Sequence, residues 1–215
     1  MKEQLYFILM ADVIDSRKVQ QDFLMKQFKK IVGTTNRIAK HKIISPITIT
    51  LGDEFQGVME DLTSALDVII KIEEEIIDKK ASFKLRYVLL EGKIETPINT
   101  KIAYEMLGSG LTETRNYLSS LKSSNDRFFV KIKNEQQSLA ISDAFRAYQG
   151  IIDDWQVDKD YEIISYFLKL KDYKLVADKL NRDRSLMWRR ERSAKIKEYV
   201  SLKNVIKYIG DCNNV

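Results

Sequence analysis

Apolar residues recur along the first two thirds of the chain with the spacing of either a strand or a helix. Short continuous or alternating apolar runs indicate strands, whereas apolar residues three and four positions apart indicate helices. The patterns predict strands at 5–12, 43–51, 55–59, 83–90, 128–132 and 139–141. They predict helices at 19–40, from a cap at 61 or 63 to 78, at 111–121 and at 142–148.

This order begins with strand, helix, hairpin, helix and strand, which a ferredoxin-like or palm sheet satisfies with short connections. In such a sheet the first strand lies centrally and the hairpin lies beside it. From about Trp155 the pattern becomes purely helical, and the predicted helices are 161–170, 174–180, 185–199 and 202–209. We therefore expect an α+β fold with a palm-like domain over 1–150 and a small all-α domain over 155–210.

Composition places the chain among globular proteins and excludes several kinds of site. The 215 residues are 44% hydrophobic and 31% charged, and no segment approaches the roughly 20 apolar residues of a membrane span. The first residues do not resemble a signal peptide, so we expect a cytoplasmic protein without a membrane partner. The single cysteine, Cys212, rules out an internal disulfide, and the single histidine, His41, argues against a His/Cys zinc site.

Basic residues are concentrated in the last quarter of the chain. Residues 1–154 contain 22 Lys+Arg and 22 Asp+Glu, whereas residues 155–208 contain 14 Lys+Arg and only 8 Asp+Glu. The excess charge therefore belongs to the predicted helical domain. This distribution indicates that only that domain meets a polyanion.

Two aspartates follow apolar, strand-like runs. Asp12 ends the first predicted strand, and Asp53 follows Gly52 in the predicted hairpin turn. Such a pair can hold Mg²⁺ or Mn²⁺ together with a phosphate, because these ions prefer oxygen ligands and take one or two carboxylates. Alternatively, Asp12 caps a turn and Asp53 shapes the hairpin. We expect Glu54 on the opposite side of the strand from Asp53.

The junction after the first strand has residues suited to an anion. Ser16 and Arg17 stand where a strand passes into a helix, and backbone N–H groups at such a junction favour phosphate. Gly52 stands beside Asp53 in the predicted hairpin turn. The candidate phosphate- or nucleotide-binding residues are therefore Ser16, Arg17 and Gly52, and the alternative for Ser16 is an ordinary helix cap.

The basic region contains a pattern similar to a helix-turn-helix. A short predicted helix with a small residue, Ala177, is followed by a polar turn at Asn181 and by a second helix near Arg184. The start of such a second helix enters the major groove of DNA, where arginine reads guanine and phosphate. The alternative is a solvated basic helix that packs on the first domain or a partner. The candidate DNA-binding residues are Arg182, Arg184, Ser185, Trp188, Arg189, Arg190 and Arg192.

Two runs carry a family resemblance. Residues 12–17 read Asp-Val-Ile-Asp-Ser-Arg, and residues 49–57 read Ile-Thr-Leu-Gly-Asp-Glu-Phe-Gln-Gly. Together with the basic helical end, these runs resemble the SatD family of bacterial proteins over most of the chain. The resemblance implies a bacterial protein but does not imply a biochemical role.

The first domain is also distantly similar to class III nucleotide cyclase catalytic domains. Asp12 and Asp53 match the metal-binding aspartates of that palm fold, and residues 108–109 match its late Gly-Asp/Ser motif. The resemblance implies a nucleotide ligand, Mg²⁺ or Mn²⁺, and a homodimer. The chain departs from the cyclase pattern at Ile49, Thr112 and Asn116, where the base-reading lysine and the Asn/Arg pair would stand. Cyclisation is therefore not expected.

The leading hypothesis is a regulator in which the first domain senses a nucleotide or phosphate and the second binds DNA. The alternative is a divalent-metal-dependent nucleotidyl transferase or cyclase of unknown substrate, whose basic helices help to bind that substrate. A structural adaptor that retains both sites as relics is a third hypothesis.

Overall fold

The computed structural model describes residues 4–18 and 20–212, and its centre is a five-stranded sheet in the order β2-β3-β1-β4-β5. The strand β1 pairs antiparallel with both β3 and β4, β2 pairs antiparallel with β3, and β5 joins parallel to β4. The first four strands therefore have the predicted ferredoxin-like order. The strands are β1 (Leu5–Val13), β2 (Ile43–Ile49), β3 (Glu54–Met59), β4 (Leu85–Lys93) and β5 (Phe128–Lys131).

The helices fall into one group between the strands and another after them. The first group is α1 (Gln21–Ile38), α2 (Leu62–Asp78), α3 (Ser109–Leu121) and α4 (Glu135–Ile152). The second is α5 (Tyr161–Leu170), α6 (Tyr173–Leu180), α7 (Arg184–Ser193) and α8 (Ile196–Asp211). Two short 3-10 turns, η1 (Ser16–Lys18) and η2 (Lys40–Lys42), flank α1.

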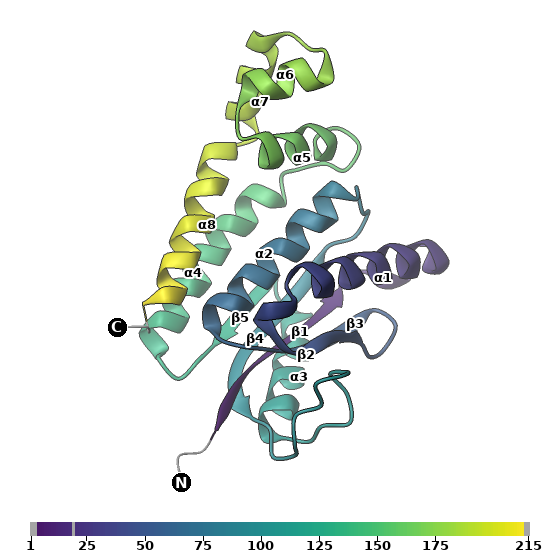
Figure 1. Cartoon of the computed structure of the whole chain (residues 1–215), viewed down its shortest axis with the longest axis vertical. Helices are drawn as coiled ribbons and strands as arrows, with labels where there is room; N and C mark the ends of the chain where they lie inside the picture. Colours follow the sequence, from purple (N-terminus) through teal and green to yellow (C-terminus); the bar gives the residue numbers. More distant parts are fainter. Residues whose placement is uncertain (1–3, 19, 213–215) are drawn as a thin grey trace.

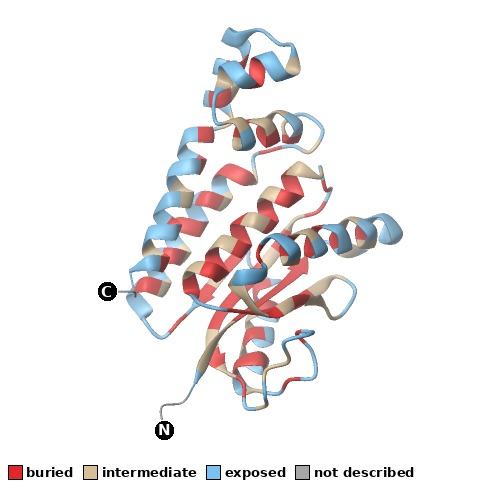
Figure 2. Cartoon of the chain, in the orientation of Figure 1, coloured by how far each residue is buried: buried red, intermediate tan, exposed pale blue. Residues whose placement is uncertain are grey.

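The sheet has a different helical cover on each face. The larger core contains Leu9, Phe28 and Ile69 and joins the sheet to α1, α2, α4 and the C-terminal helices. The smaller core contains Ile8 and Leu118 and lies between the sheet and α3. Figure 1 shows this layering, and Figure 2 shows that α2 is buried over most of its length. Because side chains alternate along a strand, successive β1 residues serve the two cores in turn.

The C-terminal helices continue the larger core. The helix α8 packs on α4 and α2, and its buried residues include Tyr199 and Ile206. The Trp155 indole donates to the Ala194 carbonyl at 3.0 Å, which ties the segment after α4 to the end of α7. The helices α6 and α7 lie at the end of the molecule farthest from the N-terminus (Figure 1). Division of the chain into domains near residues 150–155 stays a prediction.

Three expected local features are wrong. Residues 139–141 belong to α4, because Asn134 caps that helix by accepting from the Gln137 N–H and the helical period continues beyond the short apolar run. The predicted helix 185–199 is interrupted at Lys195, which has the left-handed conformation and separates α7 from α8. Phe23, whose helical spacing with the apolar residues of 19–40 predicts a place in the core, is 47% exposed.

Other boundaries agree within a few residues. The helix 161–170 is as predicted, and Asp61 caps α2 by accepting from the Ser64 N–H at 2.6 Å. The predicted first residue of α1, Val19, lies outside the described residues. Among the described helices, none has the length and apolar composition needed to cross a bilayer.

Candidate functional site

A row of three charged residues crosses the face of the sheet that α3 covers. Asp12 on β1 pairs directly with Glu54 on β3 and with Arg86 on β4. Directly paired residues of neighbouring strands point to the same face. The row therefore lies beside the smaller core, two positions along β1 from Met10. Asp12 lies within β1 and not at its end, because β4 continues to pair with β1 as far as Val13.

Asp12 is buried and is neutralised by two basic side chains. It is 2% exposed. Its Oδ2 lies 3.0 Å from the Lys122 Nζ, and its Oδ1 lies 3.6 Å from the NH1 atom of Arg86. The Oδ1 atom makes no hydrogen bond. Burying a carboxylate is costly unless it is paired, and these two cations offset that cost.

Lys122 follows α3 directly and reaches back over the row. Its Nζ also lies 3.8 Å from the Oε1 of Glu54. The hydrogen bond to Asp12 raises the pKa of Lys122, partial burial opposes this effect, and the charges of Asp12, Glu54 and Asp53 raise the pKa further. The ammonium group is therefore the point on which the carboxylates of the row converge.

The hairpin aspartate has another partner. The Asp53 Oδ2 accepts a hydrogen bond from the Ser16 hydroxyl at 2.6 Å, and the Asp53 carbonyl accepts from the Val13 N–H at 2.9 Å. These bonds join the η1 turn to the hairpin, whose Gly52 has a positive φ of 79°. The neighbour of Asp12 across the strands is therefore Glu54 and not Asp53. The sequence-based expectation for Glu54 overlooked that Asp53 stands in the turn, outside the strand alternation.

A divalent ion needs free oxygen ligands, and the charged row offers few of them. The oxygens of Asp12 already face two cations, and no cluster of three or more His, Cys, Asp or Glu side chains suited to a metal occurs in residues 4–18 and 20–212. With these side-chain positions the residues do not fit Mg²⁺ or Mn²⁺. A metal site at Asp12 and Asp53 stays a prediction from the sequence.

The remaining candidate anion residues lie on the η1 turn and on the hairpin, which the Ser16–Asp53 hydrogen bond joins. Arg17 is exposed in η1, and Gly52 is exposed in the hairpin, with open space where a side chain would project. The helix α1 begins at Gln21, after Gln20, so Ser16 is not its cap. Phosphate binding by Ser16, Arg17 and Gly52 therefore stays a prediction.

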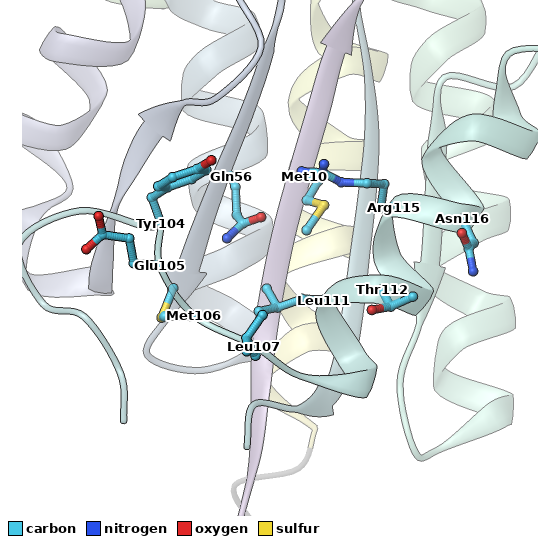
Figure 3. A pocket seen from close by; sticks show the side chains of 10 residues that line it. All are labelled: Met10, Gln56, Tyr104, Glu105, Met106, Leu107, Leu111, Thr112, Arg115 and Asn116. Carbon is cyan, nitrogen blue, oxygen red and sulfur yellow. The ribbon is translucent and has the colours of Figure 1, made fainter. Parts of the chain in front are cut away.

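A pocket adjoins the charged row on the same face of the sheet. It has a volume of about 420 Å³ and lies between α3, the sheet and the loop before α3. Figure 3 shows Arg115 extending from α3 toward Met10, while Asn116 points away from the other lining side chains. The lining residues are Met10, Gln56, Tyr104, Glu105, Met106, Leu107, Leu111, Thr112, Arg115 and Asn116.

Close packing of Gly110 on α3 against Gly92 on β4 brings the start of α3 against the sheet. A Cβ on Gly110 would lie 2.8 Å from the backbone carbon of Gly92 on β4. The first turn of α3 is closed by Glu95, which accepts from the Ser109 N–H at 2.9 Å and the Ser109 hydroxyl at 2.8 Å. The start of α3 therefore already has a carboxylate partner.

The predicted DNA-binding residues lie on and just before α7. Asn181 has the expected left-handed conformation between α6 and α7, and Ala177 is fully buried at their contact. Asp183 caps α7 by accepting from the Leu186 N–H at 2.9 Å. The two helices thus form a compact pair joined by a short turn. A separate helix-turn-helix domain stays a prediction.

The basic side chains of this pair differ in their partners. Arg190 is half-buried and bonds to Asp160, and Arg184 pairs with Asp178 at 3.1 Å. Arg184 is exposed despite this pair, and the other exposed candidates are Arg182, Ser185, Trp188, Arg189 and Arg192. The guanidinium of Arg192 lies 4.8 Å from the centre of the Trp188 ring.

Sequence reasoning missed Glu54, Lys122 and Arg115 as members of one region. Glu54 is signalled only by its pairing register with Asp12. Arg115 and Lys122 are seven residues apart, a spacing that returns to the same side of a helix. That spacing can be read from the sequence. The sequence does not show which strand this side of the helix faces.

Comparisons with known proteins give a family and distant structural similarities. No curated protein gives a significant match to this chain. A bacterial light-regulated adenylyl cyclase is similar at 13% identity and a TM-score of 0.46, over 59% of this chain and 76% of that one.

The guanylyl cyclase Cya2 is similar at 12% identity and a TM-score of 0.45, over 59% of this chain and 74% of that one. The catalytic core of a rhodopsin-guanylyl cyclase is similar at 16% identity and a TM-score of 0.40, over 60% of this chain and 77% of that one. Similarities of this size assign no function. The chain belongs to the SatD family, whose pattern it matches over residues 6–209.

Proposed function

We propose that this protein is a ligand-responsive regulator that binds a nucleotide or related phosphate in the pocket beside α3 and nucleic acid through α6 and α7. The observation that carries the proposal is the pocket itself. Its volume of about 420 Å³ lies within the range of small-molecule sites, and its lining combines apolar and polar side chains.

The lining suits a ligand with a flat apolar part and an anionic part. Tyr104 is exposed at the pocket, and an aromatic ring of this kind stacks on a base. Arg115 presents a guanidinium that binds phosphate in bidentate fashion. The Gln56 side chain donates to the Ala103 carbonyl at 2.9 Å, which holds the loop before α3 against the sheet.

The exposed arginines and the tryptophan ring on and just before α7 support the proposed binding of nucleic acid. Arg182 and Arg189 are exposed, and Trp188 is stacked with Arg192 beside them. Exposed arginine favours phosphate contacts and guanine edges. Arg184 and Arg190 already have acidic partners, so their contribution to binding requires those ion pairs to open. We also propose that the protein is cytoplasmic and forms a homodimer, as expected from the sequence.

Ligand binding is tested by thermal unfolding with a panel of nucleoside mono-, di- and triphosphates, with and without Mg²⁺. We expect at least one nucleotide to raise the unfolding midpoint in a concentration-dependent way, because a ligand that binds only the folded state stabilises it. Arg115→Met should abolish the shift, whereas Arg146→Met, an arginine on α4 outside the pocket, should retain it. No shift with any nucleotide, or an unchanged shift in Arg115→Met, would contradict the proposed pocket.

The alternative function is a metal-dependent nucleotidyl transferase or cyclase. The observation that favours it is the pair of carboxylates, Asp12 and Glu54, side by side on neighbouring strands next to the pocket. The same nucleotide panel, with labelled triphosphates and Mg²⁺ or Mn²⁺, separates the two functions. Turnover of a triphosphate by the unaltered chain, lost in Asp12→Asn, would support the enzyme function over the regulator function.

A further inference from the structure

A lysine at the end of α3 supplies a cation to the carboxylates of the charged row. Lys122 directs its ammonium group at Asp12 and Glu54, with Nζ–O distances of 3.0 and 3.8 Å. Asp53 also contributes to the field that raises the pKa of Lys122. The lysine thus stands at the place that an ion shared by these carboxylates would take.

A divalent ion at this point would face two obstacles. The ammonium would have to leave, because a metal bound to Asp12 at about 2.1 Å would overlap it. Arg86 would remain beside Asp12, with its side chain largely buried at 15% exposure, and its charge would repel the ion. Lys122 is 50% exposed on its flexible stem, so this lysine, which reaches over the row, can move aside.

We propose that the Lys122 ammonium serves as the resident cation of this site in place of a divalent metal, and that its removal uncovers a Mn²⁺ site formed by Asp12 and Glu54. Two observations support the second part: the Asp12 and Glu54 carboxylates both lie within 4 Å of the one Nζ position, and the Oδ1 of the buried Asp12 makes no hydrogen bond and has only Arg86, at 3.6 Å, beside it. This inference does not depend on the identity of the nucleotide, since its readout is the metal alone.

The test compares Mn²⁺ binding by the full chain and by Lys122→Met, measured from the loss of the free Mn²⁺ signal in electron paramagnetic resonance. We expect Mn²⁺ to bind Lys122→Met at least about tenfold more tightly than the unaltered chain, which corresponds to about 1.4 kcal/mol. Thermal unfolding supplies a second readout, because Mn²⁺ should raise the midpoint of the variant and leave that of the unaltered chain in place.

Lys131→Met is the matched control. Lys131 is also 50% exposed and also pairs with a carboxylate, Glu113, at 2.8 Å, but it lies outside the row. It should leave Mn²⁺ binding unchanged. Adding Asp12→Asn to Lys122→Met should remove the gained site. If Lys122→Met unfolds, Lys122→Gln provides the same loss of charge with a polar side chain.

Three results would overturn the inference. Equal Mn²⁺ affinity in the unaltered chain and in Lys122→Met would mean that the lysine does not occupy the ion position. Absence of binding in the folded variant would mean that the carboxylates do not form a site. Binding that persists after Asp12→Asn is added would place the ion elsewhere. None of these results would affect the thermal shift with a nucleotide or its loss in Arg115→Met. The Mn²⁺ inference and the proposed nucleotide pocket can therefore fail independently.

Discussion

Glu73 shows how a charged residue on a helix is built into the interior. Its carboxylate accepts from the NH2 group of Arg127 at 2.6 Å and from the Tyr87 hydroxyl at 2.8 Å. Burial lowers the pKa of Arg127, but the charges of Glu73 and Asp153 outweigh it and raise that pKa overall. Three glutamates in a row on a helix usually indicate a solvated face, so the sequence predicts that residues 73–75 are exposed, but Glu73 and Glu75 are buried. The buried arginine that Glu73 pairs with is 54 positions away and cannot be found from local spacing.

Glu73→Gln should destabilise the protein by about 3 kcal/mol, because it leaves the buried Arg127 with only part of its compensating charge. Chemical denaturation with the midpoint and slope fitted separately measures the change. Glu60→Gln is the control, since Glu60 is exposed after β3, and it should change stability by less than about 0.5 kcal/mol. Equal effects of the two substitutions would contradict a structural role for the network.

Among elements, α3 determines the shape of the pocket. Its first turn lies against β4 at Gly92, where a Cβ on Gly110 would also meet the Lys93 carbonyl oxygen at 2.7 Å. Gly110→Ala should therefore move α3 outward and cost about 1–3 kcal/mol, as overpacking usually does. The measurement is thermal or chemical unfolding, together with nucleotide binding as a reporter of the pocket.

Gly150→Ala is the matched substitution on another helix. Gly150 lies within α4, and a Cβ added there would meet nothing within 4 Å, so alanine should stabilise the helix by about 0.5–1 kcal/mol. Opposite signs at the two glycines are expected. A neutral or stabilising Gly110→Ala would show that the approach of α3 to the sheet is not tight.

The elements could be predicted from the sequence where their period was long. The strand and helix periods of β1 and α2 continue through each element, and both elements were predicted. The predicted position of β1 in the centre of the sheet, with the hairpin beside it, is also confirmed. The helix α4 was divided wrongly because the apolar run 139–141 is too short to distinguish a strand from a helix. Lys195 has the left-handed conformation that separates α7 from α8, and the sequence shows no sign of this break because left-handed residues are usually Gly or Asn.

The candidate site could be predicted only in part for the same reason. Asp12 is conspicuous because it is polar within an apolar strand, and its importance as a buried residue follows from that position. Its partners come from β3, β4 and the end of α3, and the sequence does not show which residues the sheet register brings opposite one another. The hairpin was predicted, but the choice of Glu54 over Asp53 was not.

At the scale of the whole molecule, the two proposed sites lie against different cores: the pocket adjoins the smaller core, whereas α6 and α7 contribute to the larger one. The pocket is on the α3 face, whereas α6 and α7 lie at the far end of the molecule, and α8 joins that end to α4 and α2 (Figure 1). A regulator requires the ligand to favour one arrangement of these parts over another. Because such coupling is reciprocal, nucleic acid must alter ligand affinity by the same factor.

The most direct test of the regulator is therefore the affinity of the full chain for duplex DNA, measured at fixed salt with and without a saturating nucleotide identified from the panel. The account predicts that the nucleotide changes DNA affinity by at least about fivefold, that DNA changes nucleotide affinity equally, and that Arg189→Ala weakens DNA binding. DNA binding that is absent, or that is unaffected by a bound nucleotide, would contradict it.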